Sequence, residues 1–455
     1  MKKIAFLFCF LFVGGVVLAQ SNITTIWQEG ESQVAFSEQT GTLNTISIEQ
    51  ISNNPQFAWV FQSGEMEDET SGDITPGGES NQAVVDQTYS GDGNKSFLFQ
   101  YGSFNKSYQK QNGNGNQFNF AGNFPENIFG SGSLPEDAVP NQDGDYHQLS
   151  QIAVGNYNQS WIYQAGRANE ASQYIEGDFN ETWTSQSGYQ QSSEMIIAGN
   201  RNGSHYLEHE EGKFPHSDEE EESSGGHSGG NGKSGNSGGE SEEGGMPDVI
   251  PPPHDEDHVF VPTVSVAIKQ MGRGSRAEML IEGDDNKAVI IQRGGTGDVD
   301  DGRVPEEDAC GGHFADQDIY GDWNRIFVSQ MGKQHNSLEY VNGTNNLVLS
   351  MQRGNSNYSD IDVIGGSNEL GIDQKGKGNI SVASIDGFFN GNFVDGIDEY
   401  AVKLVQEGKE NYSSIQITGS YNQIDAHQGG GGISFITQNG DWNTAVLNQE
   451  SIDNH

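Results

Sequence analysis

The chain has 455 residues, among them 62 glycines, and its 65 acidic against 22 basic residues give a formal net charge of −43. So large an acidic excess disfavours nucleic acids and anionic membrane surfaces as partners, and it favours solubility or the binding of cations. With only two cysteines, Cys9 and Cys310, the composition is not that of a domain held by disulfides.

Residues 1–19 are predicted to be a secretory signal peptide. A basic Met-Lys-Lys start precedes an apolar stretch from Ile4 to Leu18, and small residues stand three and one before Gln20. The stretch is short for a membrane span and ends as signal peptidase requires, so we expect no membrane insertion after its removal. Cleavage also removes Cys9, and we interpret the remaining thiol, Cys310, as an incidental loop residue.

After the signal, the phrase Gln-x-Gly-x-x-Asn recurs in an eleven-residue register, which predicts a repeat architecture. The glutamines that we expect to form a stacked ladder are Gln39, Gln100, Gln164, Gln186, Gln270, Gln292, Gln330, Gln352, Gln374, Gln406 and Gln438. The corresponding asparagines are Asn44, Asn105, Asn169, Asn357, Asn379, Asn411 and Asn443. The expected turn glycines are Gly41, Gly102, Gly166, Gly177, Gly332, Gly343, Gly354, Gly365, Gly376, Gly408, Gly419 and Gly440.

Each eleven-residue half has room for one strand and one tight corner. Between Asn324 and Gly332 the residues alternate, with Ile326, Val328 and Gln330 on one predicted face. Glycine supplies the positive backbone angle of the corner, and asparagine tolerates it next best. Stacked glutamine amides can bond to one another at the interstrand spacing of about 4.7 Å.

The residue at the glutamine position alternates between Gln and an apolar residue, so the full unit has twenty-two residues. One run of this alternation is Gln330, Val341, Gln352, Val363, Gln374 and Ile385. The sequence therefore predicts an all-β fold: a β-solenoid of two-strand, 22-residue coils with long acidic and Gly/Ser-rich loop insertions.

The register is interrupted several times, and the interruptions carry most of the prolines. We predict repeats over residues 20–122 with an acidic insert at 65–79, an insert at 123–146, repeats over 147–201, a disordered linker at 202–261, repeats over 262–294, an acidic insert at 295–320, and repeats over 321–455 with a short break near 391–399.

No motif indicates catalysis or a cofactor, so we expect neither. The histidines around the long linker have no metal-ligand spacing, and we interpret them as solvated. They are His205, His209, His216, His227, His254 and His258. Asp298, Asp300 and Asp301 resemble part of a calcium loop, but the glycine follows too early, and a solvated acidic loop is the simpler interpretation.

The repeat Ser/Asn-x5-Gln-x-Gly-x-x-Asn-x-Ala-x3-Gln resembles the curlin repeat of bacterial curli subunits. The segment from Gln438 to Gln449 follows it almost position by position. The resemblance implies export through a curli-type secretion channel, a nucleator subunit, self-association through end strands into extracellular amyloid, and attachment to abiotic or host surfaces. It also implies a Gram-negative source.

Two alternatives remain open. The chain could be a surface adhesin that does not polymerise, with an outward contact stripe of Trp161, Tyr163, Trp183, Phe327, Leu347 and Leu349. It could also be an enzyme on acidic polysaccharide, which would need converging carboxylates and bases; the bases are scattered. For the stripe, packing under an insert or between rods is the competing interpretation.

Overall fold

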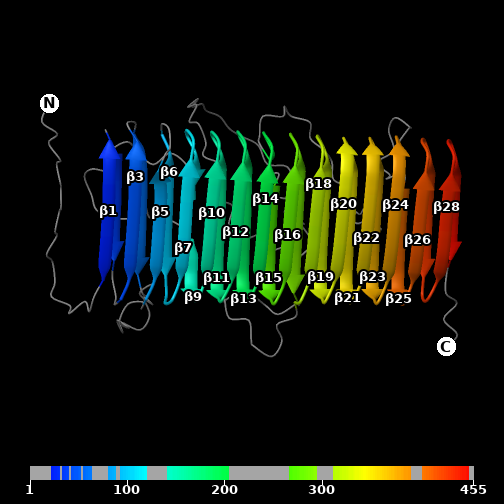
Figure 1. The fold of residues 1–455 in the computed structure, drawn as a ribbon. Helices are drawn as coiled ribbons and strands as arrows, with labels where there is room; N and C mark the ends of the chain where they lie inside the picture. Colours follow the sequence, from blue (N-terminus) through cyan, green and yellow to red (C-terminus); the bar gives the residue numbers. More distant parts are fainter. Residues whose placement is uncertain are drawn as a thin grey trace, which may run out of the picture.

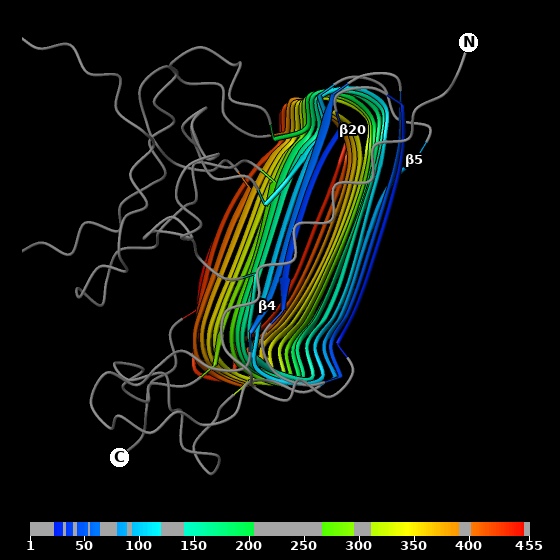
Figure 2. The ribbon, with the colours of Figure 1, turned by 90° about the vertical axis from the view of Figure 1, so that its left-hand side faces the viewer.

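The described part of the chain is an all-β solenoid, which confirms the predicted fold class. The structure, a computed structural model, describes residues 22–30, 33–39, 43–52, 55–63, 80–88, 93–119, 141–203, 266–294, 311–390 and 402–449. Successive strands alternate between two parallel sheets and stack in chain order from one end to the other (Figure 1). Seen along the stack, the coils superpose into a flattened tube with two long faces (Figure 2).

We name the two sheets A and B. Sheet A contains β1 (Ile23–Gly30), β3 (Thr45–Ser52), β5 (Gln82–Thr88), β7 (Lys106–Asn112), β10 (Gln148–Val154), β12 (Glu170–Glu176), β14 (Ser192–Ala198), β16 (Arg276–Glu282), β18 (Phe314–Tyr320), β20 (Asn336–Thr344), β22 (Tyr358–Gly366), β24 (Ile380–Phe388), β26 (Tyr412–Thr418) and β28 (Ile433–Asn439). Sheet B contains β2 (Gln33–Gln39), β4 (Gln56–Ser63), β6 (Lys95–Tyr101), β8 (Gln117–Phe118), β9 (Gln142–Asp145), β11 (Gln159–Arg167), β13 (Glu181–Tyr189), β15 (Val266–Arg273), β17 (Lys287–Gly294), β19 (Arg325–Lys333), β21 (Leu347–Asn355), β23 (Glu369–Lys377), β25 (Val402–Lys409), β27 (Gln423–Gly429) and β29 (Thr444–Gln449).

The twenty-two-residue period sets the register of both sheets. In sheet B, Gln330 is paired with Gln352, which is paired with Gln374. In sheet A, Val341, Val363 and Ile385 form the corresponding column. A residue therefore returns to the same azimuth one coil later, as the alternation predicts.

Two predicted inserts extend too far into the repeats. β9 lies inside the predicted insert at 123–146, and β18 lies inside the predicted insert at 295–320. The repeat motif lacks its asparagine in both places, because His147 and His313 occupy the corner position where asparagine is expected. The 202–261 boundary is also early by two residues, since Asn202 still bonds to Asn180 and Gly283 of the neighbouring coils.

β8 and β9 are two halves of one strand. Each pairs with β6 on one side and β11 on the other. At the break, Asn119 Oδ1 accepts the Ile162 N–H at 2.9 Å, and Asn141 Oδ1 accepts the Phe99 N–H at 2.8 Å. Side-chain amides thus take up strand donors that would otherwise be left without an acceptor.

The core between the sheets changes character along the stack. A long apolar cluster extends from Met195 to Ala426, and a smaller one lies among β3 to β6. Between them the interior is largely polar. There Gln109 Nε2 donates to Gln151 Oε1 at 2.8 Å, and Gln173 Nε2 donates to Thr184 Oγ1 at 2.8 Å. Because these buried amides are paired, the narrow core avoids the cost of burying them unsatisfied.

Several predicted features lie outside the described residues. They are the signal peptide, Gly41, Cys310, the Asp298–Asp301 loop, the six histidines of the long linker, the insert at 65–79 and the break near 391–399.

We expect that residues 204–265 can be removed without loss of the fold, because the coils on either side pair directly. Gln186 Nε2 donates to Gln270 Oε1 at 2.8 Å across this segment. A Cβ placed on Gly203 would lie 3.1 Å from the Val266 backbone nitrogen, so the two ends are close enough for a linker of about two glycines. Denaturant unfolding of this deletion should give a stability within about 1 kcal/mol of the full chain. Loss of β-sheet circular dichroism would show that the segment is needed.

Candidate functional site: the ladders and the end coils

A continuous ladder of glutamine side chains extends along the inside of sheet B. Its members are Gln39, Gln62, Gln100, Gln142, Gln164, Gln186, Gln270, Gln292, Gln330, Gln352, Gln374, Gln406, Gln428 and Gln449. Each Nε2 donates to Oε1 of the next glutamine at 2.7–3.0 Å. The second hydrogen of Gln352 Nε2 is donated across the core to the Asn336 carbonyl at 2.9 Å. The ladder thus ties each coil to its neighbour and sheet B to sheet A.

The expected ladder position of Gln438 is wrong. This residue lies in β28 of sheet A, where it pairs with Ile417. The glutamine that follows Gln406 in the sheet B ladder is Gln428 of β27. The last sheet A strand is offset by twenty-one residues from β26 because the corner before it is one residue shorter, with glycine at every position from 429 to 432. Gln438 is 6% exposed, and its Oε1 has no hydrogen-bond partner among the described residues.

A second glutamine ladder, which the sequence reasoning missed, lies in sheet A near the N-terminal end. Gln28, Gln50, Gln87 and Gln111 are bonded in series at 2.6–2.8 Å. The signal was visible in the sequence as the twenty-two-residue step from Gln28 to Gln50. Apolar residues replace glutamine in this column from Ala153 onward, and glutamine returns only at Gln438.

Two asparagine ladders close the corners. Asn44, Asn105, Asn169, Asn357, Asn379 and Asn411 follow sheet B strands, whereas Asn443 follows a sheet A strand. Within a ladder, Oδ1 accepts the backbone N–H of the next coil, as in the bond from Asn379 N to Asn357 Oδ1 at 3.0 Å. Asn346 Nδ2 in turn donates to the Gly365 carbonyl at 3.0 Å. These bonds satisfy backbone groups that the turn leaves unpaired.

The predicted turn glycines that the structure describes all have a positive φ, from 93° at Gly102 to 149° at Gly343. The corners stack so closely that a Cβ on Gly354 would lie 2.1 Å from the Gly376 carbonyl oxygen. Glycine is therefore required here for its missing side chain as well as for its φ.

Histidine replaces asparagine at three corners, and burial lowers the pKa of each. The rings of His313 and His335 are stacked, with centroids 5.2 Å apart. Burial, with a contribution from the neighbouring His335, lowers the pKa of His313 from 6.5 to about 4. Its Nδ1 accepts the backbone N–H of His335 at 3.3 Å, so the neutral ring accepts the same hydrogen bond that an asparagine Oδ1 accepts at other corners.

Glu339 is a carboxyl group buried in the core of β20. Burial is the main cause that raises its pKa from 4.5 to about 8, while hydrogen bonds from Ser337 and Ser350 act in the opposite direction. At neutral pH the folded chain therefore holds this side chain protonated.

The described end coils expose apolar side chains, at the inward position of Ile26 and at the outward positions of Trp27, Phe435 and Val446. At the N-terminal end, Trp27 is 60% exposed and Ile26 is 40% exposed; at the C-terminal end, Phe435 is 73% and Val446 is 76% exposed. Among the described strands, β1 pairs only with β3, and β29 pairs only with β27. Each end thus presents a strand edge together with uncovered apolar surface.

The outward stripe expected of an adhesin is not an exposed surface. Phe327 is 7% and Leu349 is 6% exposed, and both pack with Val289 and Ile291. Trp161, Tyr163, Trp183 and Leu347 are half-buried. The stripe is therefore not a surface of exposed side chains, and Phe327 and Leu349 pack with neighbours on adjacent strands of the same sheet.

The described residues contain no cluster of three or more His, Cys, Asp or Glu side chains arranged to hold a metal ion. Over the same residues no helix reaches the length and apolarity needed to cross a membrane.

Comparison with known proteins supports the repeat assignment. The family model of the curlin-associated repeat matches residues 343–376, which contain β21, β22 and most of β23. No curated protein matches the chain. Curlin-family proteins are extracellular structural proteins rather than enzymes. The matched segment is similar to the curlin-associated repeat, and the coils on either side of it continue the same paired sheets and ladders, which supports a curlin-repeat assignment.

Proposed function

We propose that the chain is a secreted structural subunit that stacks head to tail into extracellular curli-type fibres, which build biofilm matrix and attach cells to abiotic or host surfaces. Export through a curli-type channel and growth from a nucleator subunit accompany this role. The observation that carries the proposal is the chemical match between the first and last described coils.

The match in sheet A follows when its columns are continued from β28 into β1 of a second copy. Ile433 is in the column that contains Ile23, through the pairings that connect every sheet A strand. The inward pairs across the contact are then Ser434 with Thr24, Ile436 with Ile26 and Gln438 with Gln28. Hydroxyl meets hydroxyl, isoleucine meets isoleucine, and Gln438 Nε2, which already donates to the Gln423 carbonyl, can donate its second hydrogen to Gln28 Oε1 of the next copy.

Sheet B gives a similar match between β29 and β2. Continuing its columns places Ala445 against Ala35 and Gln449 against Gln39. Leu447 against Ser37 is the one inward pair of unlike type. On the outer face, Val446 comes to lie against Phe36, so two exposed apolar side chains cover each other.

The hydrogen bonds also give the stack a direction. In both ladders a glutamine donates to the coil nearer the C-terminus, as from Gln28 to Gln50 and from Gln428 to Gln449. The C-terminal end therefore presents amide donors, and Gln28 Oε1 at the N-terminal end is an acceptor. Joining unlike ends continues both ladders, whereas joining like ends would oppose donor to donor or acceptor to acceptor.

We expect proline at Phe435 and Val446 to stop fibre growth while leaving the subunit folded. In a parallel ladder each residue directs both backbone groups to one neighbour. Outward residues direct theirs toward the C-terminal side, as Gln423 does when its N–H donates to the Asn443 carbonyl. Proline at these outward edge positions therefore removes donors meant for the next copy and none used within the chain.

The test is seeded growth of the mature chain, followed by dye fluorescence and electron microscopy. Wild-type protein should elongate wild-type seeds, and the double-proline variant should add to seed ends without supporting further growth from its own C-terminal face. Alanine at the same two positions keeps the N–H groups and serves as the matched control, which should still elongate. Elongation of the double-proline variant at the wild-type rate would overturn the head-to-tail contact.

A further inference from the structure

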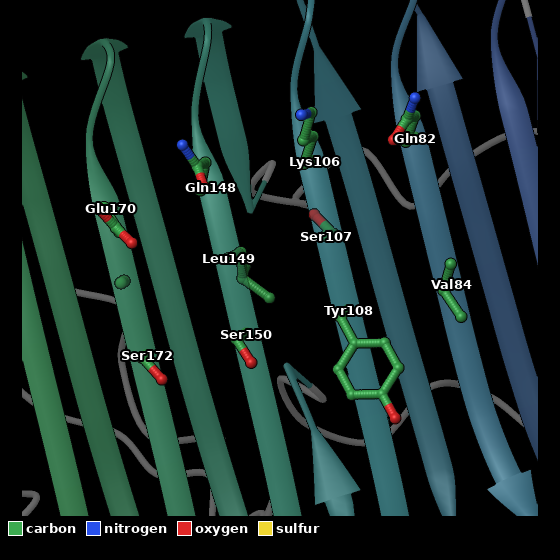
Figure 3. A pocket seen from close by; sticks show the side chains of 11 residues that line it. Gln82, Val84, Lys106, Ser107, Tyr108, Gln148, Leu149, Ser150, Glu170 and Ser172 are labelled. Carbon is green, nitrogen blue, oxygen red and sulfur yellow. The ribbon is translucent and has the colours of Figure 1, made fainter.

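A hollow on the outer face of sheet A is not explained by the ladders or by assembly. It has a volume of about 350 Å³ and lies over β5, β7, β10 and β12. Figure 3 shows its walls: Lys106, Gln148 and Glu170 form one row across the strands, and Tyr108, Ser150 and Ser172 form the next. Its floor lies at the positions of Ser107, Leu149 and Ala171, whose own side chains are buried in the core.

The hollow exists because small side chains stand between large ones. Ser150 and Ser172 follow Tyr108 along one column of outward positions, so the surface drops beside the tyrosine ring. The same column continues with Glu194, Glu278 and Asp316 on β14, β16 and β18, where carboxylates replace the serines. The hollow is therefore a local feature of four neighbouring coils and not a property of the repeat.

Its polar groups are free to bind. Within the described part of the chain, the side chains of Lys106, Gln148, Ser150, Glu170 and Ser172 make no hydrogen bond or ion pair. Elsewhere the chain pairs its polar side chains closely, as in the ladders and the bond from Lys110 to Asp86 at 2.9 Å. Hydroxyl, amide, ammonium and carboxylate groups together offer both donors and acceptors across a few ångströms.

The charges and the aromatic ring select the class of ligand. The opposite charges of Lys106 and Glu170 cancel, so the hollow has no net formal charge. The whole chain has a net charge of −43 and therefore repels polyanions. The ring of Tyr108 is seen face-on and presents a flat apolar surface beside the hydroxyl-bearing floor (Figure 3). We propose that this hollow binds a neutral polysaccharide, with a pyranose ring stacked on Tyr108 and its hydroxyl groups bonded to Ser150, Ser172 and Gln148.

This inference does not depend on fibre assembly, because the hollow lies on the outer face of sheet A and is present in a single chain. Binding of labelled cellohexaose, maltohexaose and laminarihexaose to freshly purified full-length mature chain is measured at equilibrium, with oligogalacturonate as an anionic probe. At least one neutral hexasaccharide should bind. Tyr108→Ala and Ser172→Glu should each weaken that binding at least tenfold, the first by removing the ring and the second by extending the neighbouring acidic column into the hollow.

Tyr358→Ala, on the same outer face but in β22, is the matched control and should bind as the wild type does. Circular dichroism of each variant establishes that the β-sheet is retained. The proposal fails if no neutral hexasaccharide binds, if oligogalacturonate binds more tightly, or if both Tyr108→Ala and Ser172→Glu bind like the wild type.

Discussion

Replacing Gly354 by alanine should lower the free energy of unfolding by about 3 kcal/mol or more, as expected where a strained backbone angle and a steric clash coincide. Gly354 has a φ of 108°, which is outside the region that alanine tolerates. The added Cβ would also lie 2.1 Å from the Gly376 carbonyl oxygen, which is backbone and cannot rotate away. The corner must then open, and the ladder bonds on either side lengthen.

Gly378→Asn is the matched control. Gly378 lies in the corner after β23, two corners beyond that of Gly354. Gly378 has a φ of 67°, a value close to those of Phe104 and Ser356 at other corners, and the nearest neighbour of its Cβ would be a flexible Glu410 side-chain atom at 3.9 Å. Asparagine is suited to this backbone angle, so the change should cost less than about 1 kcal/mol. Denaturant unfolding of both variants gives the comparison. Equal stabilities would contradict the view that close stacking, rather than a positive φ alone, demands glycine at the corners.

Replacing both His313 and His335 by asparagine should protect the fold from acid. Because the pKa of His313 is lowered from 6.5 to about 4, the unfolded chain takes up a proton before the folded chain does as the pH falls. The stability that the neutral ring provides is complete above pH 6.5 and is lost progressively down to about pH 4. His313 alone then contributes a loss of about 3 kcal/mol. His335, whose pKa is also lowered by burial, adds to this loss.

The measurement is the difference between the unfolding free energies of wild type and the double variant from pH 8 to pH 4. This difference isolates the histidines from other groups, such as Glu339, whose raised pKa favours the folded state as the pH falls. Asparagine occupies the same corner position at Asn357 and Asn379, so the variant should fold with its ladder intact. A pH-independent difference between the two proteins would contradict the assigned role of the buried rings.

Much of the fold could be predicted from the repeat, because the local strand and turn patterns agree with the period of the whole coil. Strand alternation, corner glycines and the return of glutamine after twenty-two residues all describe the same coil. The column of Gln330, Gln352 and Gln374 is a consequence of that period alone. Such a period can be read without knowing which coil lies next to which, since every contact is between neighbours.

The wrong predictions arose where the local sequence pattern did not show which sheet a residue belongs to, which residue type can replace asparagine, or which outer side chains are buried. Gln438 lies one half-coil beyond the ladder member Gln428 and therefore belongs to sheet A, although its local phrase matches the repeat well. Histidine in an asparagine ladder concealed β9 and β18. Burial of Phe327 on an outer face depends on tertiary packing, which strand periodicity does not encode. The match between the two end coils likewise required the complete register, because it compares strands separated by the whole stack.

A cryo-electron microscopy reconstruction of fibres grown from the mature chain tests the head-to-tail contact most directly. With fourteen strands of sheet A in the described part of the chain, one subunit should occupy about 67 Å of the fibre axis at the interstrand spacing of about 4.8 Å. We expect β28 of one copy to pair in parallel with β1 of the next, with Ile433 opposite Ile23 and Gln438 opposite Gln28. An antiparallel contact, a different register, or particles that remain single solenoids at high concentration through days of seeded incubation would contradict the proposed assembly.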